Sequence, residues 1–126
     1  MRRHIVGLGL ALVLFAALQA IEVQFFGGGL RMLGATPPYS SNPPEWFMIA
    51  HRSVLLALGL LPGYLAGRVV GNRGLIWGGI VGIIGGLLAW GITLKSLYDV
   101  FSDVVLNSVG GAVGELHYRN AQRRLS

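Results

Sequence analysis

The sequence predicts an all-helical protein that crosses a membrane several times. Of its 126 residues, 53% are hydrophobic and only 12% are charged, whereas an ordinary soluble domain has about 25% charged residues. The mean hydropathy is +0.63. Four apolar stretches follow one another along the chain, and about 20 apolar residues are enough for one transmembrane helix. We therefore expect one transmembrane domain over residues 1–126, with four helices and no soluble domain.

The first three predicted spans are strongly apolar, and the third contains no charged residue. The fourth is broken by several polar residues, but we expect it to span as well. A cleavable signal peptide is an alternative for the first stretch, although its apolar run exceeds the usual length of about 7–15 residues. The expected spans are residues 5–26, 47–70, 74–94 and 97–118, and residues 27–46 form an outer loop with two proline pairs.

The basic residues predict the orientation of these spans. With a cytoplasmic N-terminus, the inner side holds Arg2, Arg3, Arg68, Arg73, Arg119, Arg123 and Arg124, and the outer side holds Arg31, Arg52 and Lys95. Because Lys and Arg accumulate on the cytoplasmic side of membrane proteins, we expect both termini in the cytoplasm. The expected location is a prokaryotic inner membrane, with the basic tail after residue 118 at the anionic lipid headgroups.

Glycine recurs at every fourth position of the second and third predicted spans. Residues four apart share one face of a helix, and faces of small residues let membrane helices approach closely. We expect glycine-zipper packing, either within the chain or against another molecule, and a kink at Pro62. The glycines concerned are Gly59, Gly63, Gly67 and Gly71, then Gly74, Gly78, Gly82 and Gly86, and finally Gly110 and Gly114.

A second pattern is polar. Asp99, Asp103 and Asn107 are spaced four apart and share one face of the last predicted span. Polar groups that enter hydrocarbon face the bundle interior and pair with other groups. We expect an outer pocket that binds a ligand and consists of Glu22, His51, Arg52, Asp99, Asp103 and Asn107, with Gln19, Gln24 and Lys95 as further partners. Alternatively, Asp99 and Lys95 are simply solvated at a helix start.

The last span resembles the C-terminal signature of VanZ-like membrane proteins. In that family an Asp precedes an Asn by four residues, as Asp103 precedes Asn107 here, and a glycine run follows. His51 at the start of an apolar span is similar to the family's earlier histidine-led helix. This chain has Lys95 where family members carry an Arg, and it lacks their Glu/Gln pair. The resemblance implies a role in the cell envelope, including glycopeptide resistance, with Asp103 and Asn107 as site residues.

Several classes of function are excluded or disfavoured. The chain has no cysteine, which excludes disulfides and thiolate chemistry. It contains no metal-ligand histidine pair, no phosphate-binding loop and no serine-nucleophile motif. No contiguous basic patch indicates nucleic-acid binding. We therefore expect no metal, no cofactor and no nucleic acid, and we favour a non-catalytic role over an enzyme.

Three functional hypotheses follow. The first is an accessory or structural subunit that packs through its glycine faces into an oligomer or a larger membrane complex. The second is a VanZ-like envelope protein whose outer pocket binds a polar or lipid-linked ligand. The third is a holin-like pore, which is disfavoured because the charge-free third span offers no polar lining. The partners common to all three are the lipid bilayer and other membrane helices.

Overall fold

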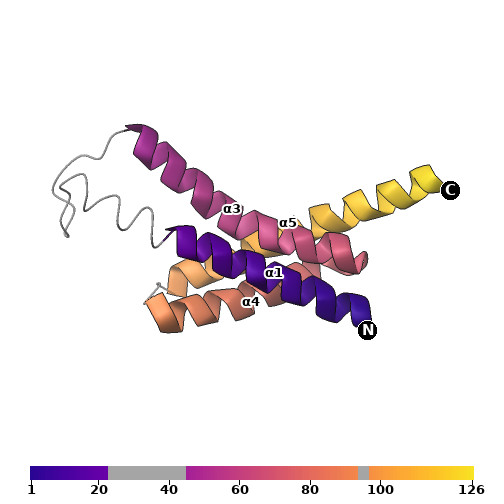
Figure 1. Ribbon diagram of the computed structural model, residues 1–126, viewed down its shortest axis with the longest axis horizontal. Helices are drawn as coiled ribbons and strands as arrows, with labels where there is room; N and C mark the ends of the chain where they lie inside the picture. The colour runs from indigo at the N-terminus through magenta and orange to yellow at the C-terminus, as the bar shows by residue number, and fades with distance from the viewer. Residues whose placement is uncertain (23–44, 94–96) are drawn as a thin grey trace.

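The computed structural model of the chain is an all-helical bundle (Figure 1). The structure describes residues 1–22, 45–93 and 97–126. These residues form four helices and no strand, which confirms the predicted all-helical fold. The helices are α1 (Arg2–Ile21), α3 (Glu45–Val70), α4 (Gly74–Thr93) and α5 (Leu97–Leu125).

Three of the described helices are long and apolar enough to cross a membrane. They are α1, α3 from Met48 to Val70, and α4 from Gly74 to Gly91. This composition fits an integral membrane protein, as predicted. α5 is not one of the three, because acidic and amide side chains interrupt its apolar residues.

Three helices differ in extent from the predicted spans. α1 begins at Arg2 rather than residue 5. α3 begins at Glu45 rather than residue 47, since an acidic residue in the first turn stabilises the positive end of a helix. α5 continues to Leu125 rather than ending at residue 118, because its tail consists of good helix formers and ends in Arg123 and Arg124, which favour the negative helix end. Two segments, residues 23–44 and 94–96, lie outside the described residues. They include most of the predicted outer loop, together with Gln24, Arg31 and Lys95.

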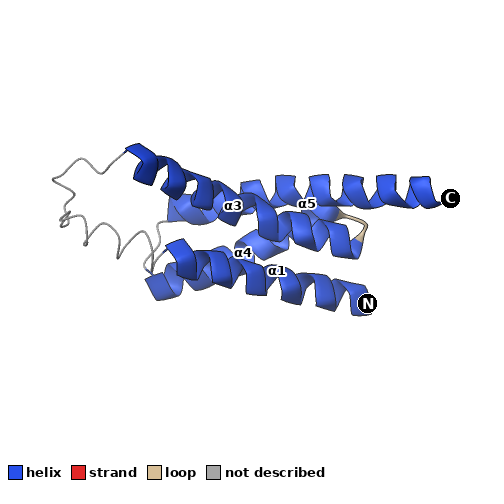
Figure 2. Cartoon of the chain, turned by 45° about the horizontal axis from the view of Figure 1, so that its top comes forward, coloured by secondary structure: helices blue, strands red, loops and turns tan. Residues whose placement is uncertain are grey.

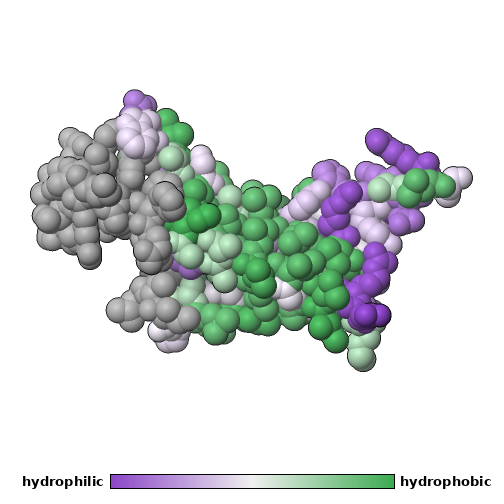
Figure 3. Space-filling view, viewed as in Figure 1, coloured by the Kyte–Doolittle hydropathy of each residue, from purple (hydrophilic) through white to green (hydrophobic). Residues whose placement is uncertain are grey.

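The helices alternate in direction along the bundle. α3 and α5 run one way, and α1 and α4 run the other way, so both chain termini lie at the same end (Figure 1). The turn between α3 and α4 lies at this end too (Figure 2). Figure 3 shows hydrophilic residues gathered at this end and a hydrophobic surface over the middle of the bundle. The seven arginines that the sequence assigns to one side therefore share one end of the molecule.

Glycine and a carboxylate shape the turn between α3 and α4. Gly71 has a positive φ of 78° and donates its N–H to the carbonyl of Gly67 at 2.9 Å, which ends α3 in the way common for helix C-termini. α4 then starts at Gly74, whose N–H donates to Glu115 Oε2 of α5 at 2.6 Å. The same carboxylate pairs with Arg119. Glu115 thus satisfies the positive start of α4 from a neighbouring helix.

The glycine rows of α3 and α4 both face α5 of the same chain. A Cβ atom on Gly63 or Gly78 would overlap the backbone carbonyl of Asn107, and one on Gly67 or Gly74 would overlap that of Gly111. α5 packs more extensively against each of these helices than they pack against each other. The remaining glycines of these two rows contact α5 as well: Gly59 meets Leu106, Gly71 meets Tyr118, Gly82 meets Val104 and Gly86 meets Val100. On α5 itself, Gly110 and Gly114 meet the α3 backbone.

α1 packs on the other side of α3 and α4. Its Gly7 lies against Val70 of α3, and the ring of Phe15 lies against Gly85 of α4. The core behind these contacts is small and apolar, and it consists of Ala11, Phe15, Leu58, Ala66, Val81 and Ala89.

α5 buries mainly small and polar residues and exposes most of its apolar residues. The buried face carries Asp103, Asn107, Gly110, Gly111 and Gly114. The exposed face carries Phe101, Val105, Val109, Val113 and Leu116. A surface helix in water shows the opposite arrangement, so this face of α5 fits contact with lipid.

Candidate functional site

A cavity of about 680 Å³ opens between α1, α3 and α5, at the end of the bundle away from the chain termini. The last turn of α1, the first turns of α3 and the first turns of α5 form its walls. Its lining residues are Gln19, Glu22, His51, Arg52, Leu55, Leu56, Asp99, Ser102, Asp103 and Leu106.

Five of the six residues predicted for an outer pocket line this cavity: Glu22, His51, Arg52, Asp99 and Asp103. They come from three helices and from sequence positions as far apart as 22 and 103. The four-residue spacing of Asp99 and Asp103 places both on the cavity side of α5, with Asp99 exposed and Asp103 only 5% exposed. Burial of an acidic residue to this degree is rare unless it is paired.

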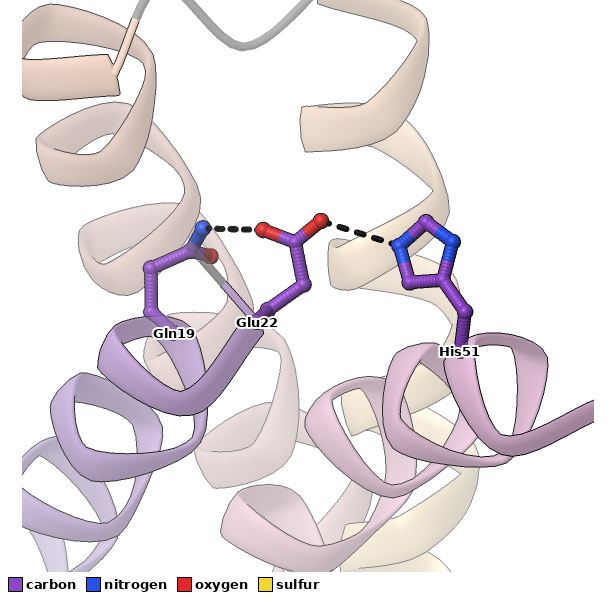
Figure 4. Close-up of polar contacts among 3 residues, drawn as sticks. All are labelled: Gln19, Glu22 and His51. Carbon is purple, nitrogen blue, oxygen red and sulfur yellow. Dashed lines mark hydrogen bonds and ion pairs between the residues drawn. The ribbon is translucent and has the colours of Figure 1, made fainter. Parts of the chain in front are cut away.

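Three side chains of the cavity form a hydrogen-bonded chain between α1 and α3 (Figure 4). Gln19 Nε2 donates to Glu22 Oε2 at 3.2 Å, and His51 Nε2 lies 3.1 Å from Glu22 Oε1. The His51 and Glu22 side chains are 26% and 24% exposed. Glu22 therefore uses both oxygens within the protein, and His51 is held with its ring at the cavity wall.

The other end of the Gln19 amide has no partner within the described part of the chain. Its Oε1 is buried and accepts no hydrogen bond there. The orientation of the amide follows from Glu22, because the opposite orientation would set the amide oxygen against a carboxylate oxygen. A buried acceptor without a partner costs about 1–3 kcal/mol, so this oxygen favours a hydrogen-bond donor beside it.

Asn107, the sixth predicted residue, does not line the cavity. It is fully buried between α3 and α5. Its Oδ1 accepts the N–H of Gly63 at 2.7 Å, and its Nδ2 donates to the carbonyl of Asp103 at 2.8 Å. Gly63 directly follows Pro62, and a proline inside a helix disturbs the hydrogen bonds around it. Neighbouring helices can supply partners at such a place, and here Asn107 supplies an acceptor to the residue that follows Pro62.

The apolar and small residues of the cavity were not predicted from the sequence. Leu55 and Leu56 lie one helical turn after His51 and Arg52, and Ser102 and Leu106 lie about one turn after Asp99 and Asp103. A helix places residues three or four apart on the same face. A search one helical turn beyond each predicted polar residue of α3 and α5 would have found all four.

The described residues contain no group of three or more His, Asp or Glu side chains that could hold a metal ion. The site is thus a cavity with mixed charges and one apolar wall. A comparison of the chain with protein-family models, with curated proteins and with solved structures finds no match.

Proposed function

We propose that the protein is a membrane protein that binds the polar head of an amphiphilic, lipid-linked ligand in the cavity between α1, α3 and α5. The observation that carries this proposal is the cavity itself. It brings together charged residues that are far apart in the sequence, and it is large enough for a small ligand, since ligand pockets have about 300–1,000 Å³.

The polar wall of the cavity suits a headgroup with both donors and acceptors. Arg52 is a cation at the wall, while the buried oxygen of Gln19 offers an acceptor for a hydroxyl or an amine. Asp103 contributes a buried acid on the opposite helix. Ionisable residues at membrane depth mark ligand or ion sites more often than they serve stability.

The apolar wall suits a hydrocarbon chain attached to that headgroup. Leu55 and Leu56 line the cavity and are 39% and 55% exposed. The cavity wall therefore continues into the apolar surface of the bundle. A headgroup in the cavity can leave its hydrocarbon chain along this surface, in contact with lipid.

We further propose that α5 crosses the membrane as a fourth span. Its outward apolar face and its length of about 43 Å, at 1.5 Å per residue, support a crossing of a hydrocarbon layer of about 30 Å. In this arrangement the glycine contacts act as a zipper inside the chain. The shared end of the seven arginines supports cytoplasmic termini and an outward-facing cavity in a prokaryotic inner membrane.

The resemblance of the last helix to VanZ-like proteins belongs to this proposal, because it concerns an envelope role and the pair Asp103 and Asn107. The accessory-subunit hypothesis stays a prediction. Its glycine faces contact α5 of the same chain, so an assembly would use a different surface. The holin-like pore stays a prediction as well.

Native mass spectrometry of the full chain, extracted in a mild detergent, tests the proposed function. We expect one retained amphiphile for each wild-type chain. Leu55→Trp fills the cavity and should abolish retention. The matched control is Leu61→Trp on the same helix, since Leu61 is 46% exposed and does not line the cavity. It should retain the ligand.

The proposed function would be contradicted if the wild type retained no amphiphile. It would also be contradicted if Leu55→Trp and Leu61→Trp retained the amphiphile equally. Asp103→Asn tests the chemistry of the cavity separately, because it changes charge with almost no change in volume. We expect it to weaken retention while the protein still inserts. A protein partner that co-purifies at fixed stoichiometry without an amphiphile would favour the accessory-subunit hypothesis instead.

A further inference from the structure

A second cavity, of about 560 Å³, lies between α3 and α5 at the opposite end of the bundle, close to the chain termini. It opens where α5 leaves the bundle. The α5 backbone still touches α3 at Gly114, which lies against Tyr64 and Arg68. Beyond that contact the last turns of α5 extend past the end of α3 (Figures 1 and 2). The cavity is lined by Arg68, His117, Asn120, Ala121, Arg124 and Leu125.

The polar groups of this cavity are mostly hydrogen-bond donors with positive charge. Arg68 lies in the last turn of α3, and Arg124 lies in the last turn of α5. Asn120 and Arg124 are four residues apart and share one face of α5. No acidic residue is among the lining residues.

His117 is fixed in place by a neighbour. The Tyr64 hydroxyl lies 2.9 Å from His117 Nδ1, and the two rings meet edge to face with centroids 5.6 Å apart. When the tyrosine hydroxyl donates to Nδ1, the ring proton is on Nε2. His117 then has a donor left for a ligand.

The positive charge of the cavity is not neutralised within the described residues. Arg68 and Arg124 have no acidic partner there. Glu115, the acidic residue of this end, is engaged by the N–H of Gly74 and by Arg119. Arg3 donates a hydrogen bond to the Tyr118 hydroxyl. Two unpaired guanidinium groups beside one cavity favour an anion between them.

We propose that this cavity binds a phosphate group. The planar guanidinium matches phosphate oxygens with two parallel hydrogen bonds, and the Asn120 amide supplies a further donor. Arg68 lies where the apolar span of α3 ends, which is the level of lipid headgroups in a bilayer. The phosphate is therefore that of an anionic phospholipid or a free phosphate ion that reaches the same level. This site is separate from the cavity of the proposed function and does not depend on it.

The proposal is tested by native mass spectrometry of the full chain in a mild detergent, which compares the binding of phosphatidylglycerol with that of phosphatidylcholine. We expect phosphatidylglycerol to bind preferentially. Arg68→Gln and Arg124→Gln should each weaken its binding about tenfold, the effect of one charge-assisted hydrogen bond. Arg123→Gln removes the same charge from the neighbouring position, outside the cavity. It should stay within about twofold of the wild type.

A second arm distinguishes the source of the phosphate. The chain is placed in phosphatidylcholine nanodiscs and titrated with inorganic phosphate by calorimetry. The site is assigned to free phosphate if inorganic phosphate binds to the wild type and not to Arg124→Gln, and if the first arm shows no preference for phosphatidylglycerol. Preference for the lipid alone assigns it to the headgroup.

The proposal is overturned if neither arm shows binding, or if Arg123→Gln weakens binding as much as Arg124→Gln. The second outcome would mean that only the net charge of the tail matters. Circular dichroism and size-exclusion elution check the fold of each variant. Arg124 lies in the turns that extend beyond α3, so its variant keeps the test decisive even where Arg68→Gln fails to fold.

Discussion

The two ends of the bundle differ in charge but share one construction. Each has a cavity between α3 and α5. At one end the cavity contains three acidic residues together with His51 and Arg52, and at the other end it contains two arginines, a histidine and no acidic residue. Between the ends the helices touch backbone to backbone at their glycines and cross one another (Figure 1).

The glycine contacts and the cavities have one cause. Because α3 and α5 meet most closely where one or both of them carry glycine, they diverge toward both ends, where both carry long side chains. Polar residues can then face the gaps without being sealed in a core. We call the contact of Gly63 and Gly67 with Asn107 and Gly111 the glycine waist.

The largest expected effect comes from breaking the glycine waist. In Gly63→Ala the new methyl group would overlap the backbone carbonyl of Asn107, which no side-chain rotation relieves. We expect the free energy of unfolding to fall by about 3 kcal/mol, measured by tryptophan fluorescence during titration with sodium dodecyl sulfate.

The matched control for this variant is Gly9→Ala on α1, where a Cβ atom meets nothing within 4 Å. Alanine is the better helix former by about 1 kcal/mol, so this variant should be as stable as the wild type or more so. Equal losses in both variants would mean that the waist does not hold α3 and α5 together.

The next effect separates the role of Asn107 from that of the cavity. We expect Asn107→Ala to cost about 2 kcal/mol, because the N–H of Gly63 loses its acceptor in a buried place. In a Pro62→Ala background the α3 helix regains its regular hydrogen bonds, so the same change should cost about 1 kcal/mol less. Strictly additive losses in the double variant would contradict the link between Pro62 and Asn107.

How far the sequence predicts these features depends on the kind of residue. Apolar runs of membrane-crossing length predicted the helices, and the spacing of Asp99 and Asp103 predicted their shared side of α5. Both inferences rest on helical periodicity alone. The six-residue pocket was predicted from topology, since residues at the same end of different spans are brought together, and five of those residues line one cavity.

The sequence could not predict which helix fills which glycine groove. The rows of α3 and α4 are equally spaced and joined by a tight turn, so mutual packing and packing against α5 satisfy the periodicity equally well. The buried position of Asn107 was also out of reach, because it depends on the contact with Gly63, which is 44 residues away. The extension of α5 to Leu125, by contrast, was readable from its helix-forming tail.

A smaller effect concerns the acid at the basic end. Glu115→Gln removes the charge that stabilises the start of α4 and pairs with Arg119. We expect a loss of about 1 kcal/mol in unfolding free energy, measured by the same titration. Glu45→Gln, an exposed acid in the first turn of α3, serves as the control and should cost about 0.3 kcal/mol. The reverse order would show that Glu115 does not cap α4.

At the acidic end we expect only a small effect on stability but a large effect on ligand retention. Glu22→Gln breaks a partly exposed pair with His51, which contributes about 0.5 kcal/mol. The variant should therefore unfold almost like the wild type while it loses the retained amphiphile. A large loss of stability with unchanged retention would assign Glu22 to the fold rather than to the site.

We propose that two water-accessible cavities lie on opposite sides of the membrane, separated by the glycine waist. The chain has no cysteine, so single-cysteine variants of α5 carry one thiol each. Ser102→Cys reports on the acidic cavity and Asn120→Cys on the basic one. Ser108→Cys reports on the region between them, where Ser108 contacts Gly79 of α4.

The measurement is labelling of these thiols by a membrane-impermeant reagent, in right-side-out and in inside-out vesicles. We expect Ser102→Cys to react only from the outer side, Asn120→Cys only from the inner side, and Ser108→Cys from neither, since reaction requires a solvated thiolate. Labelling of Ser102→Cys and Asn120→Cys from the same side, or an unreactive thiol at Ser102→Cys, would contradict the account.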